Sequence, residues 1–211
     1  MSAAIVRLFF LASLLSMLSA CSTFEQVHAL DPGTGYLPTG PNGPTVKADV
    51  TIDKKVDMSK YKGLLLVTGG DFIHQQVTTI GGFTEIMDID DLEKHIITAG
   101  LQQQVPDIQG LIGMNNAYKY YKPFLWFHFF HKKDGNTDYA QFIVTDPGTG
   151  EDVFTTQKSF NVMWAGVNDQ NTWYPLFNSY IDWLRENGLE IKAGPPVPGQ
   201  HDAQQSSTLR H

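Results

Sequence analysis

Two histidines, His128 and His131, stand three residues apart in an aromatic run and are the first candidates for a metal site. On a β-strand this spacing points the two side chains to opposite faces, so they would not hold one metal ion together. His74 and His95 are isolated in the sequence, where a histidine more often packs than catalyses. We therefore predict no metal site and no cofactor.

Four carboxylates lie close together at Asp88, Asp90, Asp91 and Glu93. A pair of them could supply the acid and base of a glycosidase that cleaves peptidoglycan. Their spacing fits a helix start better, because Asp88 can accept hydrogen bonds from free amides and the others place negative charge in the first turn. We predict a helix cap here and keep a carboxylate-dependent cell-wall hydrolase as an alternative.

Nucleophilic catalysis has no motif in this chain. None of the serines beyond the N-terminal leader lies in a Gly-x-Ser-x-Gly elbow; they are Ser22, Ser59, Ser159, Ser179, Ser206 and Ser207. Cys21 is the only cysteine. Because no second cysteine is present, no intramolecular disulfide can form, and packing alone must hold the domain.

Cys21 follows a hydrophobic leader. The apolar run Leu8–Leu18 is too short to cross a bilayer and is typical of a signal peptide. The end of this leader, Leu18-Ser19-Ala20-Cys21, resembles the lipobox of bacterial lipoproteins. The resemblance implies that residues 1–20 are removed as a signal peptide and that Cys21 is lipidated. It also implies the outer membrane, facing the periplasm, because Ser22 stands where an aspartate would signal inner-membrane retention. The alternative is an ordinary secretory signal with an accidental cysteine.

Charge and length narrow the class of protein. Lys and Arg number 15 and Asp and Glu number 22, giving a net charge of −7. A nucleic-acid backbone would be repelled, so we predict no nucleic-acid partner. The chain of 211 residues has 42% hydrophobic residues, which is enough for one core-forming domain of about 150 residues.

Composition divides the mature chain into three parts. Residues 21–46 are rich in Gly and Pro and predict a flexible tether behind the lipidated cysteine, able to stretch to about 80 Å. Residues 47–192 carry the apolar periodicity of a folded periplasmic domain. Residues 193–211 are polar and proline-rich, and we expect a disordered tail.

The periodicity of the middle part predicts the elements of the domain. Strands are expected at 47–58, 63–68, 83–87, 124–131, 139–145 and 152–162, and helices at 88–100, 107–121 and 171–188. Residues 71–79 give no clear pattern. In the last helix, Asn171 is expected as the cap, and Asn178, Asp182 and Arg185 are expected to face water. We predict an α/β fold, namely a single-domain two-layer sandwich whose mixed sheet ends in a C-terminal antiparallel meander, with helices packed on one face.

Two segments resemble a known group of envelope proteins. Gly82–His95, where a strand ends at an acidic cap and opens a helix, resembles the TolB N-terminal type, and the turn and strand Asp146–Phe154 resemble the same group. That group includes CsgG-like proteins and the lipoprotein activators of penicillin-binding proteins. The resemblance spans about residues 60 to 190 and implies a non-catalytic adaptor in envelope assembly. The chain departs from the pattern after its first long strand, where β-branched residues interrupt 71–82 and no long helix is expected.

Aromatic residues are the remaining candidates for a binding site. Tyr118, Tyr120 and Tyr121 cluster before a proline, and Trp164 and Trp173 flank a Gly- and Asn-rich loop. Aromatics near such loops often anchor partners, although they more often cap the edge of the core. The sequence therefore predicts an outer-membrane-anchored, non-catalytic adaptor that binds an envelope protein or peptidoglycan. A cell-wall hydrolase and a structural subunit of an envelope complex are the alternatives.

Overall fold

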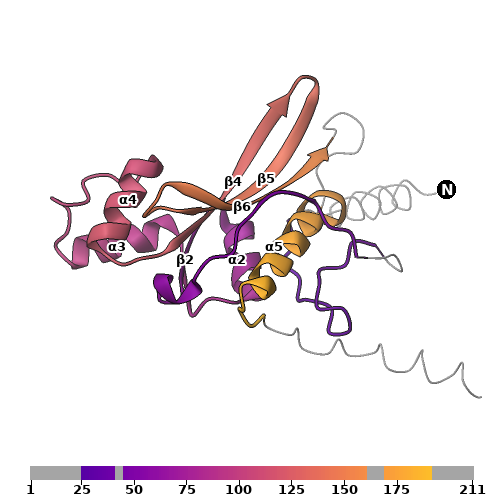
Figure 1. Ribbon diagram of the computed structural model, residues 1–211, viewed down its shortest axis with the longest axis horizontal. Helices are drawn as coiled ribbons and strands as arrows, with labels where there is room; N and C mark the ends of the chain where they lie inside the picture. Colours follow the sequence, from indigo (N-terminus) through magenta and orange to yellow (C-terminus); the bar gives the residue numbers. More distant parts are fainter. Residues whose placement is uncertain (1–24, 41–44, 161–168, 192–211) are drawn as a thin grey trace, which may run out of the picture.

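A six-stranded mixed sheet runs through the middle of the molecule (Figure 1). The computed structural model describes residues 25–40, 45–160 and 169–191. The strands are β1 (Asp49–Asp53), β2 (Leu64–Thr68), β3 (Glu85–Met87), β4 (Leu125–Asp134), β5 (Thr137–Asp146) and β6 (Glu151–Phe160). The helices are α2 (Asp71–Ile80), α3 (Ile89–Thr98), α4 (Gly110–Tyr120) and α5 (Tyr174–Glu186), with a short 3₁₀ turn η1 (Met58–Tyr61) and a π-helical turn η2 (Asp169–Trp173).

The strands lie in the order β1-β6-β5-β4-β2-β3. β2 pairs in parallel with β3 and β4, whereas β4, β5 and β6 pair antiparallel as a meander and β1 forms the antiparallel edge. The apolar run of β2 fits its place between two neighbours, because its residues Leu64 to Val67 are buried on both faces. The expected α/β sandwich, central strand and C-terminal meander are confirmed.

Helices cover both faces of the sheet. Leu65 and Val67 of β2 point to a larger core closed by α2 and α5. Leu64 and Leu66 point to the opposite face, into a smaller core closed by α3 and α4. Because side chains alternate along a strand, one apolar run serves both cores. The prediction of a two-layer sandwich with helices on one face was therefore incomplete: α2 and α5 cover one face, and α3 and α4 form a further layer on the other.

The segment 71–79, which gave no clear pattern in the sequence, is the helix α2. Its buried residues Phe72, Ile73, Val77 and Ile80 face the larger core, and this packing outweighs the low helix propensity of its β-branched residues. A helix therefore does follow the first long strand.

Helix α4 shows why glycines do not exclude a helix at 107–121. Gly110 is its first residue, and Gly113 lies against the preceding segment. A Cβ atom at Gly113 would lie 2.6 Å from the carbonyl oxygen of Asp107 and 2.8 Å from the Cα of Ile108. Such distances are too short for any side chain, so Gly113 is what allows α4 to pack this closely.

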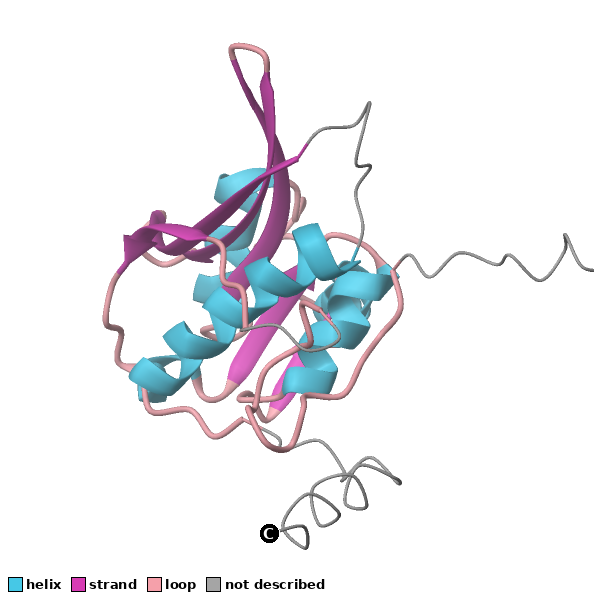
Figure 2. Cartoon of the chain, turned by 90° about the vertical axis from the view of Figure 1, so that its right-hand side faces the viewer, coloured by secondary structure: helices cyan, strands magenta, loops and turns pink. Residues whose placement is uncertain are grey.

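The hairpin of β4 and β5 extends beyond β2 and β3 (Figures 1 and 2), while β6 pairs with β5 as far as Asp138. β2 pairs only with the first residues of β4, Leu125–His128. No described strand pairs with Phe129–Asp134 on that side, while β5 pairs with them on the other. The aromatic run expected to lie wholly in the sheet is therefore only partly buried, and Phe130 is 52% exposed.

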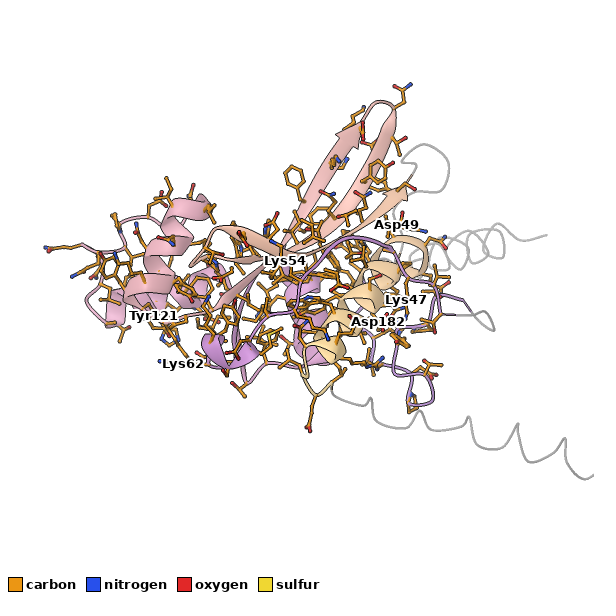
Figure 3. All side chains as sticks on the ribbon, viewed as in Figure 1. Lys47, Asp49, Lys54, Lys62, Tyr121 and Asp182 are labelled. Atoms are coloured by element: carbon orange, nitrogen blue, oxygen red, sulfur yellow. The ribbon has the colours of Figure 1, made fainter. Side chains whose placement is uncertain are left out.

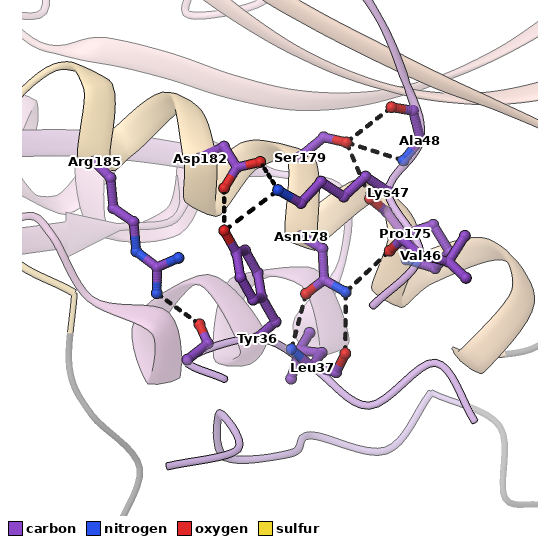
Figure 4. Close-up of polar contacts among 11 residues, drawn as sticks. Tyr36, Leu37, Val46, Lys47, Ala48, Pro175, Asn178, Ser179, Asp182 and Arg185 are labelled. Atoms are coloured by element: carbon purple, nitrogen blue, oxygen red, sulfur yellow. Dashed lines mark hydrogen bonds and ion pairs between the residues drawn. The ribbon is translucent and has the colours of Figure 1, made fainter. Parts of the chain in front are cut away.

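The described part of the expected tether packs on the domain (Figure 4). We call residues 25–40 and 45–48 the N-terminal strap. Its contact centre is Asn178 of α5, which is fully buried. The Asn178 Oδ1 atom accepts a hydrogen bond from the amide of Leu37 at 2.8 Å, and its Nδ2 atom donates to the carbonyls of Leu37 at 3.0 Å and Val46 at 3.2 Å. The expectation that Asn178 faces water was wrong, because these three bonds satisfy its amide inside the fold.

Other polar groups of α5 extend this contact. Ser179 Oγ accepts a hydrogen bond from the Ala48 amide at 2.9 Å. Asp182 accepts a hydrogen bond from the Tyr36 hydroxyl and pairs with Lys47, whose pKa this hydrogen-bonded carboxylate raises. Arg185 donates to a strap carbonyl at 2.8 Å. The strap therefore belongs to the folded domain, and the flexible tether predicted over 21–46 does not apply to its described residues.

The C-terminal helix begins later than the sequence suggested. Asn171 lies within the π-helical turn, and α5 itself starts at Tyr174 with Trp173 at the cap position. Pro175 lies in the first turn, where its missing amide proton costs no intrahelical hydrogen bond.

Candidate functional site

The three tyrosines of the predicted binding cluster point in different directions from the end of α4. Tyr118 is half-buried against the β5–β6 turn, where a Cβ atom at Gly148 would lie 2.7 Å from its ring. Tyr121 stacks on His95 of α3 with ring centroids 5.6 Å apart, and partial burial raises the pKa of its hydroxyl. Tyr120 is 44% exposed. Of the three, Tyr120 alone offers a large exposed aromatic surface.

Trp173 is a core residue and not a binding residue. It is 6% exposed and its ring lies against Phe72, Phe129 and Phe142, with centroids 5.2 to 6.0 Å apart. An aromatic side chain enclosed in this way cannot reach a partner without unfolding. The prediction of a binding role for Trp173 was therefore wrong. Trp164 and Cys21 lie outside the described residues.

Exposed apolar side chains gather on α3 and α4. The described large apolar residues that are most exposed here are Ile97, Leu111, Ile112 and Tyr120. Ile112 is 82% exposed and Ile97 is 61% exposed, although isoleucine is among the residues most often buried. Figure 3 shows Tyr121 at this end of the molecule and Asp182 of α5 at a distance from it. We call these four residues and the groove beside them the α3–α4 surface.

The groove lies between α3 and the segment that leads to α4. Its cavity volume is about 290 Å³. Apolar side chains form most of its lining, namely Ile96, Ile97, Val105, Pro106 and Ile108, with Glu93, Gln102, Asp107 and Gln109 at the polar positions. A hollow that is apolar inside and polar at intervals is the usual form of a contact site for a side chain or a small ligand.

Ile97 and Ile112 were not predicted as surface residues. Leu92 and Ile96 form the buried stripe of α3, and Ile97 lies one position beyond it. The spacing of four between Leu92 and Ile96 was the signal in the sequence that could have identified Ile97 as lying outside the buried stripe. Ile112 gave no such signal, because the two glycines around it obscured the helical pattern.

The carboxylate cluster performs the predicted cap. Asp88 Oδ1 accepts a hydrogen bond from the Asp91 amide at 2.8 Å, and Asp90 and Asp91 lie in the first turn of α3. Asp91 also pairs with Lys94 at 3.2 Å. Asp88 and Asp90 line a small hollow of about 190 Å³ together with Asp71 and His74. Asp88 already accepts the capping hydrogen bond of α3. It is therefore not available as one of the two free carboxylates that a glycosidase needs.

His128 and His131 point to opposite faces of β4, as predicted. His128 stacks on Trp126 with centroids 4.3 Å apart and shares a hydrogen bond with Thr145 at 3.1 Å. His131 lies 2.9 Å from a carboxylate oxygen of Asp138. In the part of the chain that the structure describes, no three His, Cys, Asp or Glu side chains are grouped as metal ligands would be.

The burial of His128 makes stability depend on pH. Burial lowers its pKa below the ordinary value of 6.5, and Asp152 opposes this only in part. The unfolded chain therefore binds a proton at His128 more readily than the folded chain does. The stability of the fold is unaffected by this difference above pH 6.5 and decreases as the pH falls below 6.5. We expect the loss of unfolding free energy between pH 8 and pH 5 to be smaller in His128→Gln than in the wild type. Urea unfolding at both pH values measures this difference, and equal losses in the two proteins would contradict it.

No protein-family model matches the chain, and no curated protein matches it either. Two solved structures are similar in part. One is the LpoB C-terminal domain from Salmonella enterica, with 15% identity and a TM-score of 0.33 over 50% of this chain and 87% of that one. The other is the LpoB C-terminal domain from Escherichia coli, with 14% identity and a TM-score of 0.30 over 58% of this chain and 88% of that one. Values this low indicate neither a common function nor a common partner.

Proposed function

We propose that this protein is an outer-membrane-anchored periplasmic lipoprotein that acts as a non-catalytic adaptor. Its α3–α4 surface would bind a protein of the cell envelope. The sequence Leu18–Cys21 supports the anchor, because its residues match the lipobox of bacterial lipoproteins. Within the described residues, no helix has the length and hydropathy needed to cross a bilayer.

The observation that carries the binding role is the exposure of Ile97, which lines an apolar groove, together with the exposure of Ile112 on α4. Full burial of an isoleucine side chain contributes about 1.5 to 3 kcal/mol, so covering both residues would stabilise a complex substantially. Grouped apolar residues on a polar surface commonly mark protein interaction sites. The charged residues of the groove, Glu93 and Asp107, would then select partners with basic groups at the rim.

Photocrosslinking in cells tests this proposal. A photoreactive amino acid replaces Ile112 in the full-length protein, and a matched control carries the same group at Asp53, an exposed residue of the edge strand β1. We expect one saturable crosslinked envelope protein from the Ile112 probe and none from the Asp53 probe. Mass spectrometry of the product identifies the partner.

A second variant separates binding from folding. Ile97→Lys alters an exposed side chain, so the free energy of unfolding should change by less than about 0.5 kcal/mol. The crosslink from the Ile112 probe should weaken in this variant. A protein that is lipidated and folded but gives no crosslink from Ile112 would contradict the adaptor role of this surface.

A further inference from the structure

We propose that the tip of the β4–β5 hairpin rests on the lipid headgroups of the membrane that holds Cys21. This inference uses the lipid anchor of the proposed function but not the α3–α4 surface. The domain would then contact the membrane at two places, through the acyl chains and through the hairpin. Three features of the chain support this arrangement: the reach of its anchor, the position of the strap, and the side chains of the hairpin.

The anchor allows little separation between domain and membrane. Cys21 and Glu25, the first described residue, are four residues apart. A fully extended chain spans at most about 3.6 Å per residue, so Glu25 lies within about 14 Å of the lipidated cysteine. Because the strap from there onward is packed on the domain, the part of the domain near Glu25 must lie close to the membrane surface.

That part of the domain is the base of the hairpin. The carbonyl of Gln26 accepts a hydrogen bond from the Tyr174 hydroxyl at 3.4 Å. His28 exchanges two hydrogen bonds with Gln76 of α2, at 2.8 and 2.9 Å. Trp173, the neighbour of Tyr174, packs its ring on Phe129, where the projecting half of the hairpin begins. The strap therefore starts beside the point where the hairpin extends past β2.

The length and direction of the hairpin match the reach of the anchor. α5 begins on the side from which the hairpin projects and ends on the opposite side of the molecule (Figure 1). At about 3.3 Å per residue, the stretch Phe129–Asp134 extends about 17 Å from that base. This is close to the 14 Å that the anchor allows, so the tip and the lipid anchor can meet the same surface.

The exposed side chains of the hairpin suit a headgroup layer. Phe130 is 52% exposed and belongs to neither core cluster. Lys132 and Lys133 are exposed, and neither forms an ion pair with a described residue. Ammonium groups bind lipid phosphates, and an aromatic ring next to them can enter the interface. These lysines offer positive charge to the membrane although the whole chain is acidic.

Fluorescence quenching in vesicles tests the contact. The mature lipidated protein is reconstituted into vesicles of phosphatidylethanolamine and phosphatidylglycerol that contain a lipid with a quencher on its headgroup. Because Cys21 is the only cysteine and its sulfur carries lipid, Asn136→Cys at the tip can be labelled alone with an environment-sensitive dye. Glu93→Cys, in the exposed face of α3, is the matched control. We expect strong quenching of the tip label and little of the control.

Charge reversal tests the chemistry. Lys132→Glu with Lys133→Glu should weaken the tip contact by at least about fivefold for each lysine, because each change removes an attraction of about 1 kcal/mol and adds a repelled carboxylate. Lys55→Glu with Lys62→Glu changes the net charge equally and should leave quenching at the tip unchanged; Figure 3 shows Lys62 away from the hairpin.

Flotation of the same vesicles distinguishes the two proposals. Protein that floats with the lipid but shows equal quenching at the tip and at Glu93 overturns the hairpin contact and leaves the lipid anchor intact. The hairpin contact is also overturned if the lipid quencher has no effect on the tip label and a protein bound at the tip shields that label instead. Protein that does not float overturns the anchor and the hairpin contact together.

Discussion

Replacing Asn178 by alanine is expected to lower the free energy of unfolding by about 3 kcal/mol, because three backbone groups of the strap, two of them buried, lose their partner. Alanine also leaves unfilled space where the amide stood. The strap should detach before the rest of the domain unfolds. Urea unfolding measures the energy, and limited proteolysis between Leu37 and Ala48 reports the detachment.

Asp182→Asn provides the matched control for this prediction. Asp182 lies one turn further along α5 and contacts the same strap, but its side chain is partly exposed. Ion pairs in such positions contribute about 0 to 1 kcal/mol, so the loss should stay below about 1 kcal/mol. If both variants lose the same small amount and neither becomes sensitive to protease, the strap does not contribute to the stability of the fold.

Replacing Trp173 by alanine is expected to cost about 3 to 5 kcal/mol, the usual loss when a large aromatic side chain is removed from a core. The indole fills the space between α2, β4 and β5 through its contacts with Phe72, Phe129 and Phe142. Denaturant unfolding measures this loss, provided that the m-value is the same in the variant and the wild type. The variant should also loosen the base of the hairpin, which amide hydrogen exchange at Phe129 would show.

Tyr120→Ala distinguishes a core role from a binding role. Tyr120 is exposed on α4, so its removal should change the unfolding free energy by less than about 0.5 kcal/mol. A Trp173→Ala protein as stable as Tyr120→Ala would show that Trp173 does not hold the core together, and would restore the binding role that the sequence suggested.

The sheet could be predicted because its signals are local. β2 lies in an uninterrupted apolar run, and the strands of the meander alternate apolar and polar residues. The turn between β5 and β6 is closed locally, by a hydrogen bond of 2.8 Å from the Gly150 amide to the Asp146 carbonyl. The start of α3 could be predicted for the same reason, since Asp88 caps an amide only three residues away. Each of these features is decided by neighbours in the sequence.

The strap and the α3–α4 surface could not be predicted in this way. Leu37 and Asn178 are 141 residues apart, and a window that contains either of them shows only a Gly- and Pro-rich segment or a polar position on a helix. Trp173 was misjudged because sequence alone does not tell whether an aromatic beside a loop points inward. The exposure of Ile112 follows from the placement of α4 by its close contact at Gly113, which is a tertiary effect.

The strap also determines where the protein can search for a partner. With the proposed lipid on Cys21, a tether of some 25 free residues would let the domain explore the depth of the periplasm, whereas the three residues between Cys21 and Glu25 would confine it to a thin layer at the membrane. Diffusion within such a layer is two-dimensional, and it raises the effective concentration of any partner held in the same membrane. A component attached to the opposite membrane, or lying deep in the cell wall, would have to cross the gap itself.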